Sequence, residues 1–391
     1  MKSTMVVFLK EVRENLRDRR TVINTLVTGP LMAPLIFVLL INTLVTRELD
    51  KAEKPLPLPV IGAEYAPNLV AALAQADVEI KPAPSDPERA VRDQDVDVVL
   101  RIPASFTQSW QNGEPAQVEM IYDASQRDAG GTVARLRAML DHYSTRTGAL
   151  RLLSRGLSPS ILKAVTVADR DQSTPQSRSG NLFAMLPYFF ILGGFIGGMA
   201  LAIDTTAGER ERQSLEPLLA NPVPRWQLLA GKLSATTTFA ITTVLLSILA
   251  FSVVGHYLPT EKIGMSMQLG PRFLVCTMFV MLPLAALLAG LQTLVAAFAK
   301  SYREAQTYLS LLMFVPVIPT MMLSLMPVKA QMWMYALPLM GQQVIITRLM
   351  RGDPVPDSAL ALSFVCSAIA ALLVAAVTVR VYRSERLAIS A

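Results

Sequence analysis

The segment Leu182–Ile203 reads LFAMLPYFFILGGFIGGMALAI and contains no charged side chain. An α-helix of about 20 apolar residues crosses the hydrocarbon core of a bilayer. The composition of the 391-residue chain fits this environment, because 52% of its residues are hydrophobic and 17% are charged. An average soluble domain has roughly 25% charged residues. The segment is therefore predicted to span a membrane.

Six further uncharged blocks lie along the chain. They cover residues 21–46, 233–254, 273–299, 305–328, 330–347 and 358–379. The block 330–347 is the shortest and contains Pro338 and Gly341. Irregular backbone is tolerated inside a bilayer only where protein or water satisfies it. We therefore predict a polytopic α-helical membrane protein with six transmembrane helices: the first over 21–46, and five more in a membrane domain over 181–391 that also holds a re-entrant segment at 330–350.

The basic residues fix the predicted orientation. With six spans, Lys and Arg accumulate on one side, at the N-terminus, in the loop 204–232, around residue 300 and in the C-terminal tail. Loops rich in Lys and Arg stay in the cytoplasm. A seventh span would place the C-terminal arginines outside. Both termini are therefore predicted to be cytoplasmic, in a multi-pass protein of a bacterial inner (plasma) membrane.

Residues 47–180 differ in character from the rest of the chain. They hold 16 Lys and Arg against 18 Asp and Glu, whereas the remainder holds 20 against 12. Short β-rich runs at 58–63, 78–80, 96–102 and 118–122 alternate with helix-like stretches, which indicates a small α/β domain. A longer helix is predicted over about 126–155. This domain is inserted between the first and second spans and is predicted to be extracytoplasmic.

Sequence motifs for chemistry are missing. The chain contains no G-x-x-x-x-G-K-[ST], no H-E-x-x-H and no G-x-S-x-G, so neither a Walker-type ATP site nor a common hydrolase site is predicted. Its two cysteines and two histidines suffice neither for a disulfide framework nor for a zinc site. We expect a non-catalytic subunit without a cofactor or metal of its own. The basic excess is explained by membrane orientation, so no nucleic-acid partner is expected.

The N-terminal residues 1–20 are predicted to form an amphipathic helix. Met5, Leu9, Val12 and Leu16 make one apolar stripe, and six Lys and Arg surround it. Such a helix suits the headgroup region of a membrane. An ordinary solvated lead-in to the first span is the alternative.

The loop 204–232 combines charge with a small apolar patch. The charged run Glu209, Arg210, Glu211 is followed by Leu215, Glu216, Leu218 and Leu219, then by two prolines, Arg225 and Lys232. A short helix with this composition is a docking element for a partner protein. A solvated connecting loop is the alternative.

Small and polar residues inside the spans are candidates for helix packing or for a transport pathway. Gly193, Gly194, Gly197 and Gly198 form two small-xxx-small pairs, which let helices approach closely within the chain or across a dimer axis. Asn42 and Gln292 are the pathway candidates, with interhelical hydrogen bonding as the alternative for Gln292. No carboxylate lies at mid-span, where ion relays usually place one.

The sequence resembles the ABC-2 type permease family, and within it the NatB-like, sodium-export type branch. The resemblance rests on Phe8-x-Lys10-Glu11 to Arg17-Asp18-Arg19-Arg20, and on the run from Gly208-Glu209-Arg210-Glu211 through Leu215-Glu216-x-Leu218-Leu219 and Pro224-Arg225 to Gly231-Lys232. It implies an ABC-2 exporter-like fold and a homodimer whose subunits each bind a separate cytoplasmic ATPase, the chain that would carry ATP and Mg.

Residue roles follow from the same resemblance. It implies that residues 1–20 form an interfacial elbow helix, whose motif residues are Lys10, Glu11, Arg17 and Asp18. It makes Glu209–Leu219 the coupling helix, and Glu209, Arg210, Glu211, Leu215, Glu216, Leu218, Leu219 and Arg225 the ATPase-coupling residues.

Three functions compete at this point. The first is the membrane-spanning permease of an ABC exporter, with sodium or an amphipathic compound, peptide or lipid as cargo. The second is a membrane-anchored sensor or signalling scaffold with a ligand-binding extracytoplasmic domain. The third is a secondary transporter, which predicts inverted repeats and a charged midplane site. The sequence shows neither of these features.

Overall fold

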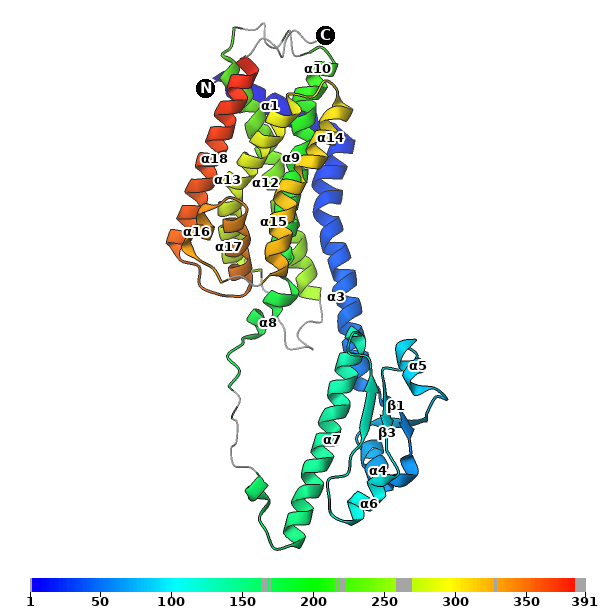
Figure 1. Ribbon diagram of the computed structural model, residues 1–391. Helices are drawn as coiled ribbons and strands as arrows, with labels where there is room; N and C mark the ends of the chain where they lie inside the picture. The colour runs from blue at the N-terminus through cyan, green and yellow to red at the C-terminus, as the bar shows by residue number, and fades with distance from the viewer. Residues whose placement is uncertain are drawn as a thin grey trace. The chain divides into compact units, whose positions relative to one another are not determined.

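The computed structural model describes residues 2–162, 168, 170–214, 217, 222–257, 269–326 and 329–383 (Figure 1). The chain divides into two compact units. The first, here called the membrane unit, comprises Met1–Val45 and Gln172–Ala391, and the second, the inserted unit, comprises Thr46–Asp171. Each unit is described separately.

Among the described residues, the membrane unit contains six helices that are long and apolar enough to cross a bilayer, in agreement with the six-helix prediction. They are η1 and α3 (Ile23–Thr28 and Gly29–Glu53), α9 with η4 and α10 (Leu186–Ile203, Asp204–Gly208 and Glu209–Glu211), α12 (Arg225–Tyr257), α13 (Pro271–Ala296), α14 with α15 (Tyr302–Leu312 and Phe314–Leu325), and α18 (Asp357–Arg383). Shorter helices α1 (Lys2–Arg17), α2 (Arg19–Val22) and α8 (Pro175–Leu182) precede the first and second of these.

Two helices differ from their predicted bounds. The third span begins at Arg225 rather than at residue 233, because the polar residues after Pro224 continue the apolar helix without a breaker. The fifth span is two helices that meet at Met313. Pro316 and Pro319 each lack a backbone N–H, so the carbonyls four residues earlier lose their helical donors.

The helix α9 packs closely against α12 and α13 through its glycines. A Cβ at Gly197 would lie 2.5 Å from Thr243 Oγ1, and a Cβ at Gly198 would lie 2.9 Å from Gln292 Oε1. A Cβ at Gly193 would make only ordinary contact, 3.4 Å from Ser247. In the described residues this glycine row is therefore used for packing within the chain, and its use across a dimer axis stays a prediction.

Residues 330–350 form a hairpin of two short helices, α16 (Met332–Ala336) and α17 (Met340–Met350). Neither is long enough to cross a bilayer. Leu339 joins them with φ of 72°, a value that a non-glycine residue rarely adopts. The hairpin packs against α9, α13, α15 and α18.

The inserted unit is built on a four-stranded sheet in the order β2-β1-β3-β4. The strands are β1 (Leu56–Ile61), β2 (Val78–Pro82), β3 (Val98–Arg101) and β4 (Glu119–Tyr122), and only β3 and β4 pair antiparallel. The helices are α4 (Pro67–Gln75), α5 (Pro87–Arg92), α6 (Ser105–Gln111) and α7 (Arg127–Ser154), with single turns η2 (Ala63–Tyr65) and η3 (Pro159–Leu162). Leu58, Leu100 and Leu136 are fully buried in its core.

Candidate functional site: a charged cluster at the polar end

One end of the membrane unit, here called the polar end, gathers helix α1, the α10 segment, the start of α12, the turn between α13 and α14, and the end of α18 (Figure 1). Charged side chains from these elements contact one another or cap neighbouring helix ends. The charged motif of the loop 204–232 lies at the centre.

The innermost ion pair joins Lys232 of α12 to Glu209 of α10. The Lys232 side chain is 2% exposed and that of Glu209 is 8% exposed. Lys232 Nζ also donates to the carbonyl oxygen of Thr205 over 2.7 Å. Thr205 lies in η4, a single turn of π-helix, a feature common at functional sites. A buried charge is tolerated only when it is paired and hydrogen-bonded, so Lys232 holds the end of the second span against the start of the third.

Helix α1 adds a second layer of charge to this pair. Lys10 lies 3.4 Å from Glu11, 3.4 Å from Glu14 and 3.9 Å from Glu209. Glu11 is buried, at 2% exposure. Its burial raises the pKa of its carboxyl, and so does Glu209, whereas Lys232 and Lys10 oppose the rise. Partial burial lowers the pKa of Lys10, but the three neighbouring carboxylates raise it above its ordinary value.

A glycine permits the close approach of α1 to α12. A Cβ at Gly231 would lie 2.8 Å from the side chain of Val7 and 2.9 Å from the carbonyl oxygen of Thr4. Any larger residue would push α1 away from α12. Gly231 and Lys232 therefore act together. Gly231 lets α1 approach α12, and Lys232 supplies a positive charge close to the carboxylate of Glu11 on α1.

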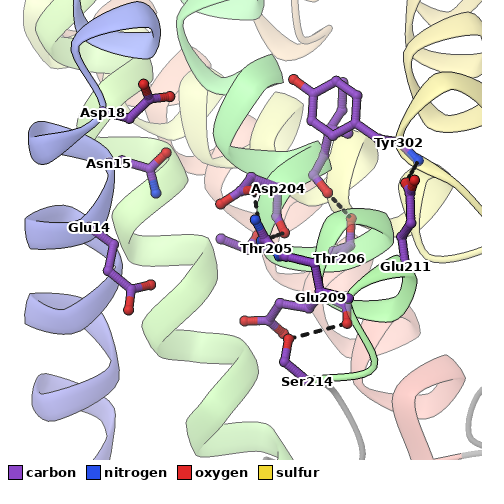
Figure 2. Close-up of polar contacts among 12 residues, drawn as sticks. Glu14, Asn15, Asp18, Asp204, Thr205, Thr206, Glu209, Glu211, Ser214 and Tyr302 are labelled. Atoms are coloured by element: carbon purple, nitrogen blue, oxygen red, sulfur yellow. Dashed lines mark hydrogen bonds and ion pairs between the residues drawn. The ribbon is translucent and has the colours of Figure 1, made fainter.

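Three further charged residues of the loop contact the ends of three other helices. Arg210 donates to the carbonyl oxygen of Ala299, just beyond α13, over 3.0 Å. Glu211 accepts from the backbone N–H of Tyr302, the first residue of α14, over 2.7 Å, as Figure 2 shows. Arg225 donates to the carbonyl oxygen of Tyr382 near the end of α18 over 3.0 Å. A helix has unpaired N–H groups and a partial positive charge at its start, and unpaired carbonyls and a partial negative charge at its end. Each of these side chains has the opposite charge to the helix end that it contacts, so each contact stabilises that end.

Local bonds hold the charged segment in shape. Arg212 donates to Asp204 over 2.8 Å, and the Ser214 hydroxyl donates to the carbonyl oxygen of Glu209 over 3.2 Å (Figure 2). Residues 204–211 continue the helix of the second span as η4 and α10. The two bonds hold the turn that follows, at residues 212–214, against the end of this helix.

The structure changes one expectation for the predicted coupling residues. Glu209 was expected on a helix that meets a partner, but its carboxylate is buried against Lys232. The sequence around Glu209 did not reveal this ion pair, because Lys232 lies 23 residues further along the chain. Leu215, Glu216, Leu218 and Leu219 lie outside the described residues, so their predicted contact with a partner stays a prediction.

The four predicted elbow-helix residues have different surroundings, and Asp18 lies just after the end of α1. Lys10 and Glu11 join the charged cluster, whereas Arg17 and Asp18 are exposed; Asp18 accepts from the Thr21 hydroxyl over 2.5 Å. Of the predicted apolar stripe, Met5, Leu9 and Leu16 are about half exposed, whereas Val12 packs against a buried cluster that includes Ala235 and Phe239 of α12.

The two pathway candidates have different surroundings. Asn42 is exposed on α3. Gln292 is fully buried, and its Nε2 donates to the carbonyl oxygen of Phe195 over 2.7 Å. Gln292 therefore makes the interhelical hydrogen bond that was the alternative to a pathway role.

The sequence marked Lys232 as the end of the loop motif without giving it a role, and it did not single out Thr205 and Tyr302. Thr205 and Tyr302 contribute backbone groups, which no side-chain pattern reveals. Lys232 did leave a signal, since it lies two turns into an otherwise apolar helix. A lysine at such a depth needs a carboxylate partner.

Comparisons with known proteins agree with this architecture. A family model described as "ABC-2 family transporter protein" matches residues 21–380. The chain is also 25% identical over 362 residues to the "ABC transporter permease protein NatB" of Bacillus subtilis (strain 168). That alignment covers 91% of this chain and 92% of the relative.

Proposed function

Because the chain belongs to the ABC-2 family of transporter proteins and is a permease subunit of an ABC transporter, we propose that it forms the membrane path of an exporter. In this proposal two copies form a homodimer, and each copy binds a separate cytoplasmic ATPase. ATP and Mg belong to that ATPase, and this chain contributes no catalytic group. The cargo crosses between two conformations of the dimer that ATP binding interconverts.

The observation that supports coupling is the position of the charged segment in the polar end. Glu209, Arg210 and Glu211 are consecutive, and each contacts a different part of the membrane unit. A force applied to this segment reaches α1, α12, α13 and α14 through direct contacts. In the proposal, the leucines that follow contact the ATPase, and the charged residues before them pass its movement to the helices.

Charge supports the proposed orientation. The polar end collects the basic residues of the N-terminus and of the loop 204–232, so it is proposed to face the cytoplasm of a bacterium. The inserted unit follows the first span and precedes the second, which places it on the extracytoplasmic side in this proposal. Both termini are then cytoplasmic.

The proposed cargo is a hydrophobic or amphipathic compound, such as a peptide or a lipid, with sodium as the second candidate. In the part of the six spans that the structure describes, the Asp, Glu, Lys and Arg residues lie near the helix ends. The buried polar groups deeper in the spans are amides and hydroxyls such as Gln292 and Thr243. Neutral groups of this kind favour a cargo that carries little charge.

The test is co-purification of the detergent-solubilised chain from its native membrane, followed by an ATPase assay. We expect a soluble ATPase to co-purify and to hydrolyse ATP. Alanine at Leu215, Leu218 and Leu219 together is expected to abolish both association and turnover. The matched control replaces Leu150, Leu153 and Leu157, three exposed leucines of the inserted unit, and is expected to leave both unchanged.

Two outcomes would contradict the proposal. If the triple alanine variant still binds its ATPase with wild-type turnover, these leucines are not the coupling contact. If the chain co-purifies with no ATPase but with signalling proteins, the sensor or scaffold function replaces the exporter.

A further inference from the structure

The fifth span, α14 with α15, is loosely packed in the membrane unit and runs between two distinct polar contacts. Only 17% of its most apolar stretch is buried in the chain, compared with 61% for the second span and 56% for the fourth. The sixth span is equally exposed, but it packs along α13 for much of its length. The fifth span therefore has few buried side chains holding it against its neighbours, and the polar contacts at its two ends stand out.

Its first contact lies at the polar end. The backbone N–H of Tyr302 begins α14 and donates to Glu211 over 2.7 Å. The N–H of Glu304, two residues further on, donates to the Ser301 hydroxyl. Glu211 therefore links the charged segment directly to the start of the fifth span (Figure 2).

Its second contact lies near the other end of the same span. Gln343 of α17 donates from Nε2 to the Ser324 hydroxyl of α15 over 2.8 Å. Gln343 is 2% exposed, and its Oε1 has no hydrogen-bond partner among the described residues. This amide is thus bound to the fifth span by a single bond inside a buried environment, where a lost hydrogen bond is costly.

The neighbouring glutamine holds the hairpin together. Gln342 accepts from the N–H of Leu339 over 2.8 Å and donates to the Ser367 hydroxyl of α18 over 2.8 Å. It thereby fixes Leu339, the residue with positive φ, at the junction of α16 and α17. The two glutamines therefore have different contacts: Gln342 bonds the hairpin to α18, and Gln343 bonds it to the fifth span.

Between the two contacts the span contains a break. Helix α14 ends before Met313, and the prolines in α15 leave carbonyl groups without helical donors. The Thr320 hydroxyl donates to the carbonyl oxygen of Pro316, one turn earlier in α15, over 2.7 Å. Sharp bends in helices occur at prolines, so the two halves of this span can change their mutual angle while each stays helical.

We infer that the fifth span carries the movement of the charged segment at the polar end to the α16–α17 hairpin, with Glu211 and Gln343 as positioning residues at its two ends. The inference rests on the proposed function, because the movement originates in an ATPase. Two contacts on one element do not by themselves demonstrate coupling. The test must therefore measure whether a change at one end alters the response at the other.

The readout is the rate at which a cysteine in the hairpin reacts with a membrane-impermeant maleimide, with and without ATP. Leu337 joins the two hairpin helices and is 48% exposed, so Leu337→Cys reports on the hairpin. The background from Cys276 and Cys366 is measured in the chain without this substitution. The experiment uses the full chain with its co-purified ATPase in lipid nanodiscs.

The variant at the hairpin end is Ser324→Ala, and its conservative partner is Ser324→Thr, which keeps the hydroxyl. Ser310→Ala is the matched control, because the Ser310 hydroxyl lies on the same span and bonds only to its own helix, at Gln306. A hydrogen bond contributes about 0.5–1.5 kcal/mol, equivalent to about a 2- to 12-fold effect. We expect Ser324→Ala to reduce the ATP-dependent change in labelling by this factor, and the other two variants to retain it.

The variant at the polar end is Glu211→Ala, with Glu211→Gln as the rescue because the amide oxygen still accepts the Tyr302 N–H. We expect Glu211→Ala to reduce the labelling change by the same factor when that change is normalised to the ATP hydrolysis rate measured for each variant. Combined with Ser324→Ala, it should add little further loss, because both interrupt one route. A purely structural role would instead alter the labelling rate without ATP and the thermal stability.

Several results separate the inference from the proposed function. A Ser324→Ala chain with the same ATP-dependent change as Ser310→Ala overturns the inference and leaves the exporter intact. Fully additive losses from the two alanine substitutions also overturn it. A chain that carries no ATPase at all overturns the proposed function, and the inference with it.

Discussion

Replacing Lys232 with methionine removes the ammonium group that pairs with the buried carboxylate of Glu209 and nearly preserves the side-chain volume. Glu209 then loses its buried ion-pair partner and keeps only the partly exposed Lys10, 3.9 Å away, while the side chain of Glu11 remains 3% exposed close by. Breaking a buried ion pair by removing one partner costs about 3–5 kcal/mol. The methionine also leaves the carbonyl of Thr205 without its donor, which adds to the loss. The cavity contribution is small because the two side chains are similar in size.

This cost should be visible in thermal unfolding. In domains of 150–250 residues, each kcal/mol lowers Tm by about 2–4 °C. Lys232→Met is therefore expected to lower Tm by roughly 6–20 °C. The assay heats the detergent-solubilised chain and measures the fraction that remains monodisperse on size-exclusion chromatography.

The matched control is Lys10→Met. Lys10 also approaches Glu209, at 3.9 Å, but its side chain is 44% exposed. Exposed pairs contribute about 0.2–1 kcal/mol, so its Tm should change by no more than about 4 °C. The double variant Lys232→Met with Glu209→Gln removes both charges and should recover most of the loss. Equal Tm values for the two lysine variants would refute the conclusion that the Lys232 pair is buried and necessary.

Three further predictions concern packing and pH. Gly197→Ala should destabilise the membrane unit by about 1–3 kcal/mol, because its Cβ would collide with α12, whereas Gly193→Ala should be close to neutral in the same thermal assay. The pKa of Glu11 is raised in the folded state, so its contribution is present below the unfolded value and is lost as pH rises through the folded value. The Tm gain of Glu11→Gln over wild type should therefore grow as pH rises above about 4.5, and an equal gain at every pH, or one matched by Glu14→Gln, would contradict this. Gly62→Ala should destabilise the inserted unit by more than the roughly 1–2 kcal/mol of its positive φ, because its Cβ would also lie 2.2 Å from a backbone oxygen; proteolysis of the unit measures it, and wild-type resistance would show that this turn rearranges.

The six spans could be predicted because a bilayer imposes length and apolarity on each helix separately. Their ends were less predictable. The apolar part of the third span was expected to begin at residue 233, and Arg225–Lys232 was expected to start its helix; α12 does begin at Arg225, since a helix that leaves the bilayer can continue with polar residues. The hairpin at 330–350 could be anticipated because Pro338 and Gly341 are poorly suited to a straight helix.

The role of the motif residues was only partly predictable. Sequence placed Glu209, Arg210 and Glu211 together, and their charge suggested a contact with another protein. In the structure Glu209 is buried, Arg210 is half-buried and Glu211 is exposed, and the three contact groups that are 23, 89 and 91 residues away. Two of these partners are backbone atoms at helix ends, which every sequence has and no sequence marks.

The sequence by itself indicated six helices able to cross a membrane, a soluble-like insertion after the first of them, and a resemblance to the ABC-2 transporters. These properties follow from local composition, because each apolar segment must satisfy the bilayer independently of the others. Only the tertiary structure decided which charges pair, which glycines meet which helices, and which end of the fifth span contacts Gln343. Those outcomes depend on the packing of helices that are distant in sequence, and packing is a property of the assembled unit rather than of any segment.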